Sequence, residues 1–283
     1  MKRETKILVP IDFSECSENA LAFAMQLADK IKAILILLNV PHFDSGGIEN
    51  VTFVVDEVEN RTEQSRISMN KSIHKVTEKV RASLDEAPSI QIDIRMGNVE
   101  ATISDVALRN QVDYIVIGTQ GENSTLDKYL GSVASNVLKN APCPVMVIPE
   151  NSELAENLVL GYATDFSDAD PFGIWKAMKL FKPFQPIIKC VHFDEPQVHN
   201  EDKIKELERY FAETSPELNV ELYNLPVKDK VKDMNGFIEE HNVNMLVMYK
   251  PNRSFFESIF HKSYTVKMAK HTNIPLLVFK ESK

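Results

Sequence analysis

Three glycines and one serine, gathered in a short stretch, are the residues of this chain best suited to bind a ligand. Gly118, Gly121, Gly131 and Ser132 form the pattern G-x2-G-x9-G-S, although the whole chain has only nine glycines. Glycine lets the backbone approach a ligand closely. A helix that begins at Gly131 and Ser132 would present unpaired N–H groups and the positive end of its dipole. This arrangement suits a phosphate group.

Further candidate residues stand at the ends of apolar runs elsewhere in the first half, namely Asp12, Val40 and Gly97. Parallel strands end at one edge of a sheet, and ligands of open α/β sheets bind beyond that edge. Each residue also has a plainer explanation. Asp12 is explained by a helix cap, Val40 by the core, and Gly118 and Gly121 by turns. The edge shared by all of them favours a ligand site.

Apolar runs alternate with helical patterns through the first half. The runs predict strands at residues 6–11, 33–40, 89–95, 112–117 and 144–148. The patterns predict helices from a cap at Ser14 or Ser17 to residue 32, over residues 62–84, over residues 99–108, and up to residue 139. In the second helix the inward positions are expected at Ile67, Met69, Ile73, Val76 and Val80. This order predicts an α/β fold with a doubly wound, five-stranded parallel sheet of the Rossmann-like type.

The second half of the chain repeats the first. Asp165-Phe166-Ser167 matches Asp12-Phe13-Ser14, and residues 113–147 align without a gap with residues 244–278. We therefore predict an internal duplication with tandem domains at residues 1–150 and 156–283, joined by a linker at residues 150–155.

The three glycines are missing from the second copy. Tyr249, Asn252 and Lys262 stand at the aligned positions, while Ser263 remains. Side chains there would fill the space that a backbone cradle for phosphate requires. The sequence therefore predicts a ligand site in the first domain and a degenerate second domain.

Composition and charge exclude several classes of protein. The net charge of −9 and a pI near 5.4 argue against a nucleic-acid binder and against adsorption to anionic membranes. The first residues lack the apolar core of a signal peptide, and no apolar run approaches the ~18 residues of a membrane span. The cysteines are three and widely spaced, which indicates neither a disulfide framework nor a metal site. A cytoplasmic location is expected.

Taken together, residues 7–14 (ILVPIDFS), Gly97, the glycine pattern and residues 142–145 (PCPV) resemble the universal stress protein family. The resemblance covers essentially the whole chain as two domains of the adenine nucleotide alpha hydrolase-like type. It implies that ATP binds, with or without Mg²⁺. Asp127 lies in the glycine stretch, where a solvated loop carboxylate is the favoured explanation and a role in holding that ion is the alternative.

The resemblance also implies roles for single residues. Asp12 would contact the nucleoside and Val40 would lie along adenine. The phosphates would be held by Gly118, Gly121, Gly131 and Ser132, and the expected site is completed by Pro10, Gly97 and Val133. In the family, domains pair through their last strands, so residues 144–148 and 275–279 would form an intrachain pseudo-dimer, and a homodimer of the tandem chain is a further expectation.

The expected function is that of a nucleotide-dependent regulatory module in a stress response, with adenine nucleotide and an unidentified protein as partners. The chain contains no HExxH, GxSxG or CxxC motif, so no catalytic constellation is predicted. Two alternatives remain at this point, a slow ATPase and a nucleotide-free dimerising scaffold.

Overall fold

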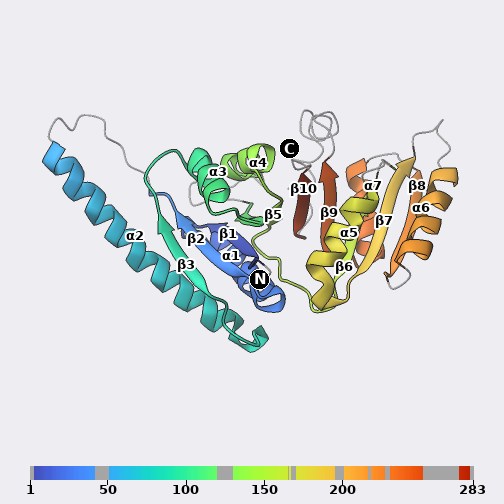
Figure 1. The fold of residues 1–283 in the computed structure, drawn as a ribbon, viewed down its shortest axis with the longest axis horizontal. Coiled ribbons are helices and arrows are strands. Elements are labelled where there is room, and N and C mark those ends of the chain that lie inside the picture. The colour runs from blue at the N-terminus through green and yellow to red at the C-terminus, as the bar shows by residue number, and fades with distance from the viewer. Residues whose placement is uncertain are drawn as a thin grey trace. The chain divides into compact units, whose positions relative to one another are not determined.

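The computed structural model describes residues 3–41, 51–119, 130–164, 166, 170–194, 201–215, 218–226, 230–250 and 274–280. The chain divides into two compact units, Met1–Glu153 and Leu154–Lys283. The dividing point falls within the stretch that the sequence marks as a linker. Figure 1 labels the helices and strands of both units.

The first unit is built on five parallel strands in the order β3-β2-β1-β4-β5. Their bounds are β1 Lys6–Pro10, β2 Ile34–Asn39, β3 Ile90–Ile94, β4 Tyr114–Gly118 and β5 Val145–Ile148. In the centre, Leu8 lies opposite Ile36 on one side and Ile115 on the other. These three side chains are buried, which explains why the sequence shows continuous apolar runs rather than alternation.

Four helices belong to this unit: α1 Glu15–Ile31, α2 Val51–Val80, α3 Val99–Arg109 and α4 Ser132–Asn140. Helix α1 packs against α2, and α3 packs against α4 (Figure 1). Ser14 caps α1, because its side chain accepts a hydrogen bond from the N–H of Ser17. Of the two cap candidates, Ser14 is therefore the cap.

Helix α2 differs from the sequence prediction at both ends and on its face. It begins at Val51, earlier than expected, and ends at Val80, where a 3-10 turn, η1 Arg81–Ser83, follows. Residues 51–55 form its first turns.

The inward face of α2 carries two serines in place of one of the predicted apolar residues. Ser65, Met69 and Ser72 are buried, whereas Ile67 is 60% exposed, so the prediction that Ile67 faces the core is wrong. The small serines allow α1 to come close, and the Ser72 hydroxyl donates to Glu18 Oε1 at 2.8 Å. A pattern of apolar residues alone does not reveal such a face.

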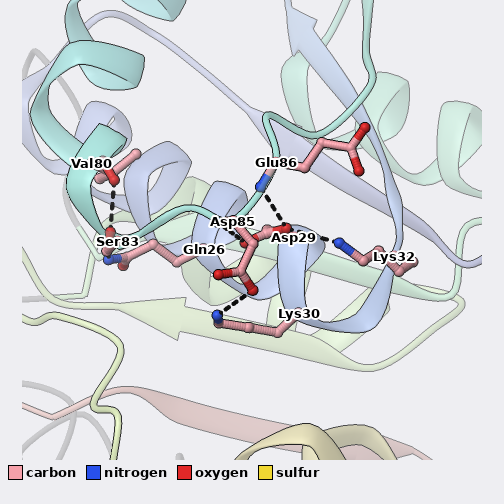
Figure 2. Close-up of polar contacts among 8 residues, drawn as sticks. All are labelled: Gln26, Asp29, Lys30, Lys32, Val80, Ser83, Asp85 and Glu86. Atoms are coloured by element: carbon pink, nitrogen blue, oxygen red, sulfur yellow. Dashed lines mark hydrogen bonds and ion pairs between the residues drawn. The ribbon is translucent and has the colours of Figure 1, made fainter.

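A polar clasp joins the end of α1 to the turn after α2 (Figure 2). The buried Asp29 carboxylate accepts from the N–H of Asp85 at 2.7 Å, from the N–H of Glu86 at 3.2 Å and from Lys32 Nζ at 3.1 Å. Burial raises the pKa of Asp29, but the backbone N–H of Asp85 and the hydrogen bond and charge of Lys32 outweigh it, so that the pKa lies below its ordinary value. Nearby, Lys30 forms an exposed ion pair with Asp85.

The second unit repeats this topology. Its parallel strands follow the order β10-β9-β6-β7-β8, with bounds β6 Val159–Ala163, β7 Ile187–Asp194, β8 Val220–Pro226, β9 Met245–Lys250 and β10 Leu276–Lys280. Its helices are α5 Asp170–Phe181, η2 Lys182–Phe184, α6 Glu201–Thr214 and α7 Lys230–Glu240.

The strand register supports the gap-free alignment of the two halves. Gly118 of β4 lies opposite Ile148 of β5, and Tyr249 of β9 lies opposite Phe279 of β10, so the aligned residues occupy the same ladder position. The predicted α/β fold class with parallel sheets is confirmed. In the part of the chain that the structure describes, no helix has the length and apolar character needed to span a membrane.

Candidate functional site

A cleft of about 570 Å³ opens at the carboxyl edge of the first unit's sheet. It lies where β1 has β2 on one side and β4 on the other, which is the switch point at which open α/β sheets bind ligands. Its walls come from all four helices and from the ends of three strands. The lining residues are Pro10, Ile11, Asp12, Phe13, Ser17, Leu38, Asn39, Val40, Pro41, Ser65, Val99, Ile103, Ile117, Gly118, Thr119, Gly131, Ser132, Val133 and Ala134.

Most of the predicted site residues meet in this cleft. The lining includes Pro10, Asp12, Val40, Gly118, Gly131, Ser132 and Val133. Gly97 is not among the lining residues. Gly121 and Asp127 lie outside the described residues. The structure thus brings together residues that are more than 100 positions apart in the chain.

The amino end of α4 is open toward the cleft. Gly131 is its N-cap, with no side-chain hydrogen bond, and the first helical residues Ser132, Val133 and Ala134 line the cleft. In contrast, α1 and α3 are capped by the side chains of Ser14 and Asn98. The first N–H groups of a helix have no partner within it, so α4 offers donors and a positive dipole end to an anion.

Asp12 lies between the end of β1 and the start of α1 and lines the same cleft. Its carboxylate accepts from the Ser14 hydroxyl at 2.6 Å and from the Ser14 N–H at 3.2 Å. Phe13 between them has a φ of 68°, in the left-handed region. Asp12 is therefore not the cap of α1, as the plainer explanation had it, but bonds to Ser14, which is the cap, and it also lines the cleft.

Two of the predicted glycines have structural reasons that do not involve a ligand. A Cβ at Gly118 would lie 2.9 Å from the backbone oxygen of Cys16 and 2.9 Å from its Sγ, so close packing against α1 excludes a side chain. Gly97 has a φ of +143°, which side chains rarely adopt. Gly131 has φ −57° and ψ 156°, which any residue can adopt. Of these three, Gly131 is the one that the backbone does not require.

Sequence reasoning missed several lining residues, among them Asn39, Ser65, Val99 and Thr119. Asn39 directly precedes Val40, so its place at a strand end was a usable signal. No sequence signal pointed to Ser65, because the pattern of apolar residues in α2 placed Ile67, and not Ser65, on the buried face of that helix. Within the described residues, no group of three or more His, Cys, Asp or Glu side chains could hold a metal ion.

At the position that corresponds to Gly118, the second unit carries a large side chain. Tyr249 takes the position of Gly118, and a Cβ at Gly173 of α5 would lie 2.9 Å from Tyr249 Cβ. In the first unit the glycine of this strand–helix contact lies in the strand, as Gly118 of β4, whereas in the second unit it lies in the helix, as Gly173 of α5. Beside it, the buried Asp170 carboxylate accepts from the Tyr162 hydroxyl at 3.0 Å and also from the Thr164 hydroxyl. The three side chains are thus joined by hydrogen bonds inside the second unit.

Comparisons of sequence point to one family. A model of the universal stress protein family matches residues 4–149. Universal stress protein YxiE of Bacillus subtilis is 29% identical over 145 residues, which cover 50% of this chain and 97% of the relative. Universal stress protein MJ0531 of Methanocaldococcus jannaschii is 28% identical over 144 residues, which cover 50% of this chain and 81% of the relative.

Comparisons of structure extend the likeness over both units. A universal stress protein from Archaeoglobus fulgidus aligns with 98% of this chain and 96% of its own, with a TM-score of 0.74 and 18% identity. A protein of Pseudomonas aeruginosa described as functionally unknown aligns with 99% of this chain and 93% of its own, with a TM-score of 0.65 and 12% identity. At these identities the likeness shows the fold, in its tandem form.

Proposed function

The chain belongs to the universal stress protein family, and from that premise we propose that its first unit binds an adenine nucleotide, ATP, in the cleft. The bound nucleotide controls how the chain acts on a protein partner in a stress response. The second unit is a degenerate copy that binds no nucleotide.

The observation that carries this proposal is the uncapped amino end of α4 at the cleft. Gly131 leaves the first turn of α4 without a side-chain acceptor, and that turn lines the cleft. An anion placed there accepts from backbone N–H groups and meets the positive end of the helix dipole. In the proposed complex the N–H groups of Ser132 and Val133 and the Ser132 hydroxyl hold the phosphates.

The rest of the cleft suits the nucleoside. Its volume of about 570 Å³ lies within the range of ordinary small-molecule sites. Val40, Val99 and Ile103 give an apolar wall for a flat base, and Asp12 offers carboxylate oxygens to sugar hydroxyls. These residues bind and orient the ligand, and no step of chemistry is assigned to them.

The test replaces Gly131 with aspartate. Aspartate is a preferred N-cap, and the backbone at this position accepts it, so the unliganded Gly131→Asp protein should be as stable as the wild type or more so. Its carboxylate would occupy the phosphate position and repel the ligand. We expect the affinity for ATP, measured by isothermal titration calorimetry, to fall at least tenfold, or by about 1.4 kcal/mol.

Gly131→Asn is the matched control, since it caps the helix with a neutral group of the same size. It should weaken ATP binding less than Gly131→Asp does, because it adds competition for the N–H groups without repulsion. Equal ATP affinities in the wild type and the aspartate variant would show that the phosphates do not bind at α4. Steady release of phosphate over many turnovers would instead favour the alternative of a slow ATPase.

A further inference from the structure

Helix α5 of the second unit carries two exposed aromatic side chains. Phe172 is 47% exposed and Trp175 is 46% exposed, and their rings are stacked with centroids 6.3 Å apart. Lys176 Nζ lies 4.3 Å from the centre of the Phe172 ring. Lys179 Nζ lies 4.8 Å from the centre of the Trp175 ring. These four residues, which we call the α5 face, combine apolar area with positive charge, as interaction surfaces do.

The equivalent face of α1 in the first unit is covered. The interval from β1 to β2 has the same length as that from β6 to β7, so α1 and α5 align without a gap. Phe172 takes the place of Asn19, which is 7% exposed. Trp175 takes the place of Ala22, which is 5% exposed. Helix α2 contributes to this cover, since Lys79 Nζ donates to Asn19 Oδ1 at 3.4 Å. In this fold, therefore, a helix docks on this face.

The second unit uses its corresponding helix differently. Helix α6 follows β7 as α2 follows β2, but it has 14 residues against 30 and packs on β8. It buries Leu207 and Phe211, whereas Phe172 and Trp175 stay exposed. Among the described residues of this unit, α6 thus does not take the place that α2 takes on α1. The α5 face is a surface for a helix from elsewhere.

A surface of opposite charge lies on the amino-terminal turns of α2, which project beyond the sheet of the first unit (Figure 1). Val55 is 50% exposed, and the carboxylates Asp56 and Glu59 beside it are exposed as well. Val58, three positions after Val55, is half-buried. We call these four residues the α2 end. It combines apolar area with negative charge.

The α5 face and the α2 end match each other in pattern and in charge. Each has two apolar residues three positions apart and two charged residues three positions apart, and a helix places residues at this spacing on one side. Lysines on one surface and carboxylates on the other would fix the register of an apolar contact. Two α5 faces would place lysines against lysines, and two α2 ends would place carboxylates against carboxylates. Each surface therefore selects the other.

We propose that the chain forms a homodimer in which the α2 end of one copy docks on the α5 face of the other. With two-fold symmetry the contact occurs twice, because each copy supplies one surface of each kind. Burial of the apolar side chains stabilises the contact, and the exposed charges make it weaken as salt is added. The dimer does not require a nucleotide, so its failure and the failure of the proposed function are separate results.

The test is sedimentation velocity of the wild-type chain over a series of concentrations. The fraction of dimer should rise with concentration and fall with added salt. Trp175 is the only tryptophan of the chain, so the fluorescence maximum should move to shorter wavelength as the dimer forms. A chain that is still monomeric at about 0.1 mM in low salt would overturn the proposal. A dimer with unchanged tryptophan emission would do so too.

Exchange of the charges identifies the two surfaces. One variant carries Lys176→Glu with Lys179→Glu, and a second carries Asp56→Lys with Glu59→Lys. Each variant alone should stay monomeric, because like charges meet at both contacts. An equimolar mixture should form heterodimers, since each surface again meets its opposite, and this recovery also shows that both variants fold.

Tyr210→Ala is the matched control, because it removes an exposed aromatic side chain of α6 outside both surfaces. It should dimerise like the wild type. Dimers formed by either charge variant alone, or a mixture that remains monomeric, would contradict the pairing of the α2 end with the α5 face.

Discussion

Three of the glycines that the sequence predicts as site residues differ in whether their backbone or their packing requires a glycine. Gly97 is required by its φ of +143° and Gly118 by the backbone of Cys16 at 2.9 Å, whereas the φ of −57° and ψ of 156° at Gly131 are open to any residue. The sequence predicts all three as site residues because it shows their spacing and their places at strand ends but not their neighbours in space. Cys16 is about 100 positions away from Gly118, so the sequence around either residue does not predict that the two are in contact. The ligand that we propose therefore concerns Gly131 more directly than the other two glycines.

Gly118→Ala is therefore expected to destabilise the first unit. The added Cβ meets backbone atoms of Cys16 that cannot move aside, and such overpacking typically costs about 1–3 kcal/mol. The measurement is the free energy of unfolding of the unliganded protein by calorimetry. Gly131→Asn serves as the control and should unfold at or above the wild-type temperature. Equal stability of Gly118→Ala and wild type would mean that α1 does not pack on β4 as described.

Asp29 gives a prediction that depends on pH. Its pKa is lowered in the folded protein, so its stabilising contribution is fully present above the unfolded value of about 4 and is lost as the pH falls through the folded value. Asp29→Asn should reduce the free energy of unfolding at pH 7 by about 1–3 kcal/mol, because the amide keeps one acceptor oxygen and places an NH2 group where the other oxygen accepts, and because the charge that pairs with Lys32 is lost. The difference from wild type should shrink below about pH 4.

Asp85→Asn is the matched control for Asp29→Asn. The Asp85 side chain is 72% exposed in its ion pair with Lys30, and exposed pairs contribute little to stability. This variant should stay within about 1 kcal/mol of wild type at every pH. If both variants were equally mild at pH 7, the clasp at Asp29 would not stabilise the fold.

At the scale of elements, the strands were predictable and one helix was not. The strands β1, β2, β4 and β5 are buried on both faces, so each shows a continuous apolar run, whereas the edge strand β3 alternates apolar and polar residues. Helix α2 is polar over much of its length and buries serines where the pattern suggested Ile67. Its face is decided by the fit to α1 and by the pairing of Ser72 with Glu18. Which residues of α2 are buried therefore depends on its tertiary contacts, which the pattern of apolar residues does not show.

The corrected face of α2 can be tested with one pair of variants. Met69 is fully buried, so Met69→Ala should cost about 2–5 kcal/mol of the first unit's stability. Ile67 is 60% exposed, and Ile67→Ala should change stability by no more than about 0.5 kcal/mol. Thermal unfolding followed by calorimetry distinguishes them. A larger loss for Ile67→Ala would restore the face that the sequence predicted.

At the scale of the whole molecule, the two units share a topology and differ at one edge. The duplication was predictable because residues 113–147 align with their copy without a gap, and the strand registers agree with it. The exchange of small and large residues between strand and helix, with Gly173 facing Tyr249, was not predictable, because the partners lie in different elements. Pairing of the two units through their last strands stays a prediction from the family resemblance.

This difference between the units predicts how much nucleotide the chain holds. The first unit has an open cleft at the uncapped amino end of α4. At the matching place the second unit has Tyr249 and the Asp170 carboxylate, which accepts hydrogen bonds from the Tyr162 and Thr164 hydroxyls. We expect one adenine nucleotide per chain at saturation.

Native mass spectrometry of the purified chain with saturating ATP tests the central claim most directly, since it counts bound ligands on the intact molecule. The account predicts a single added nucleotide in the wild type and none in Gly131→Asp under the same conditions. Two nucleotides per chain would contradict the closed second unit. No bound nucleotide in the wild type, or the same occupancy in Gly131→Asp, would contradict the proposed site.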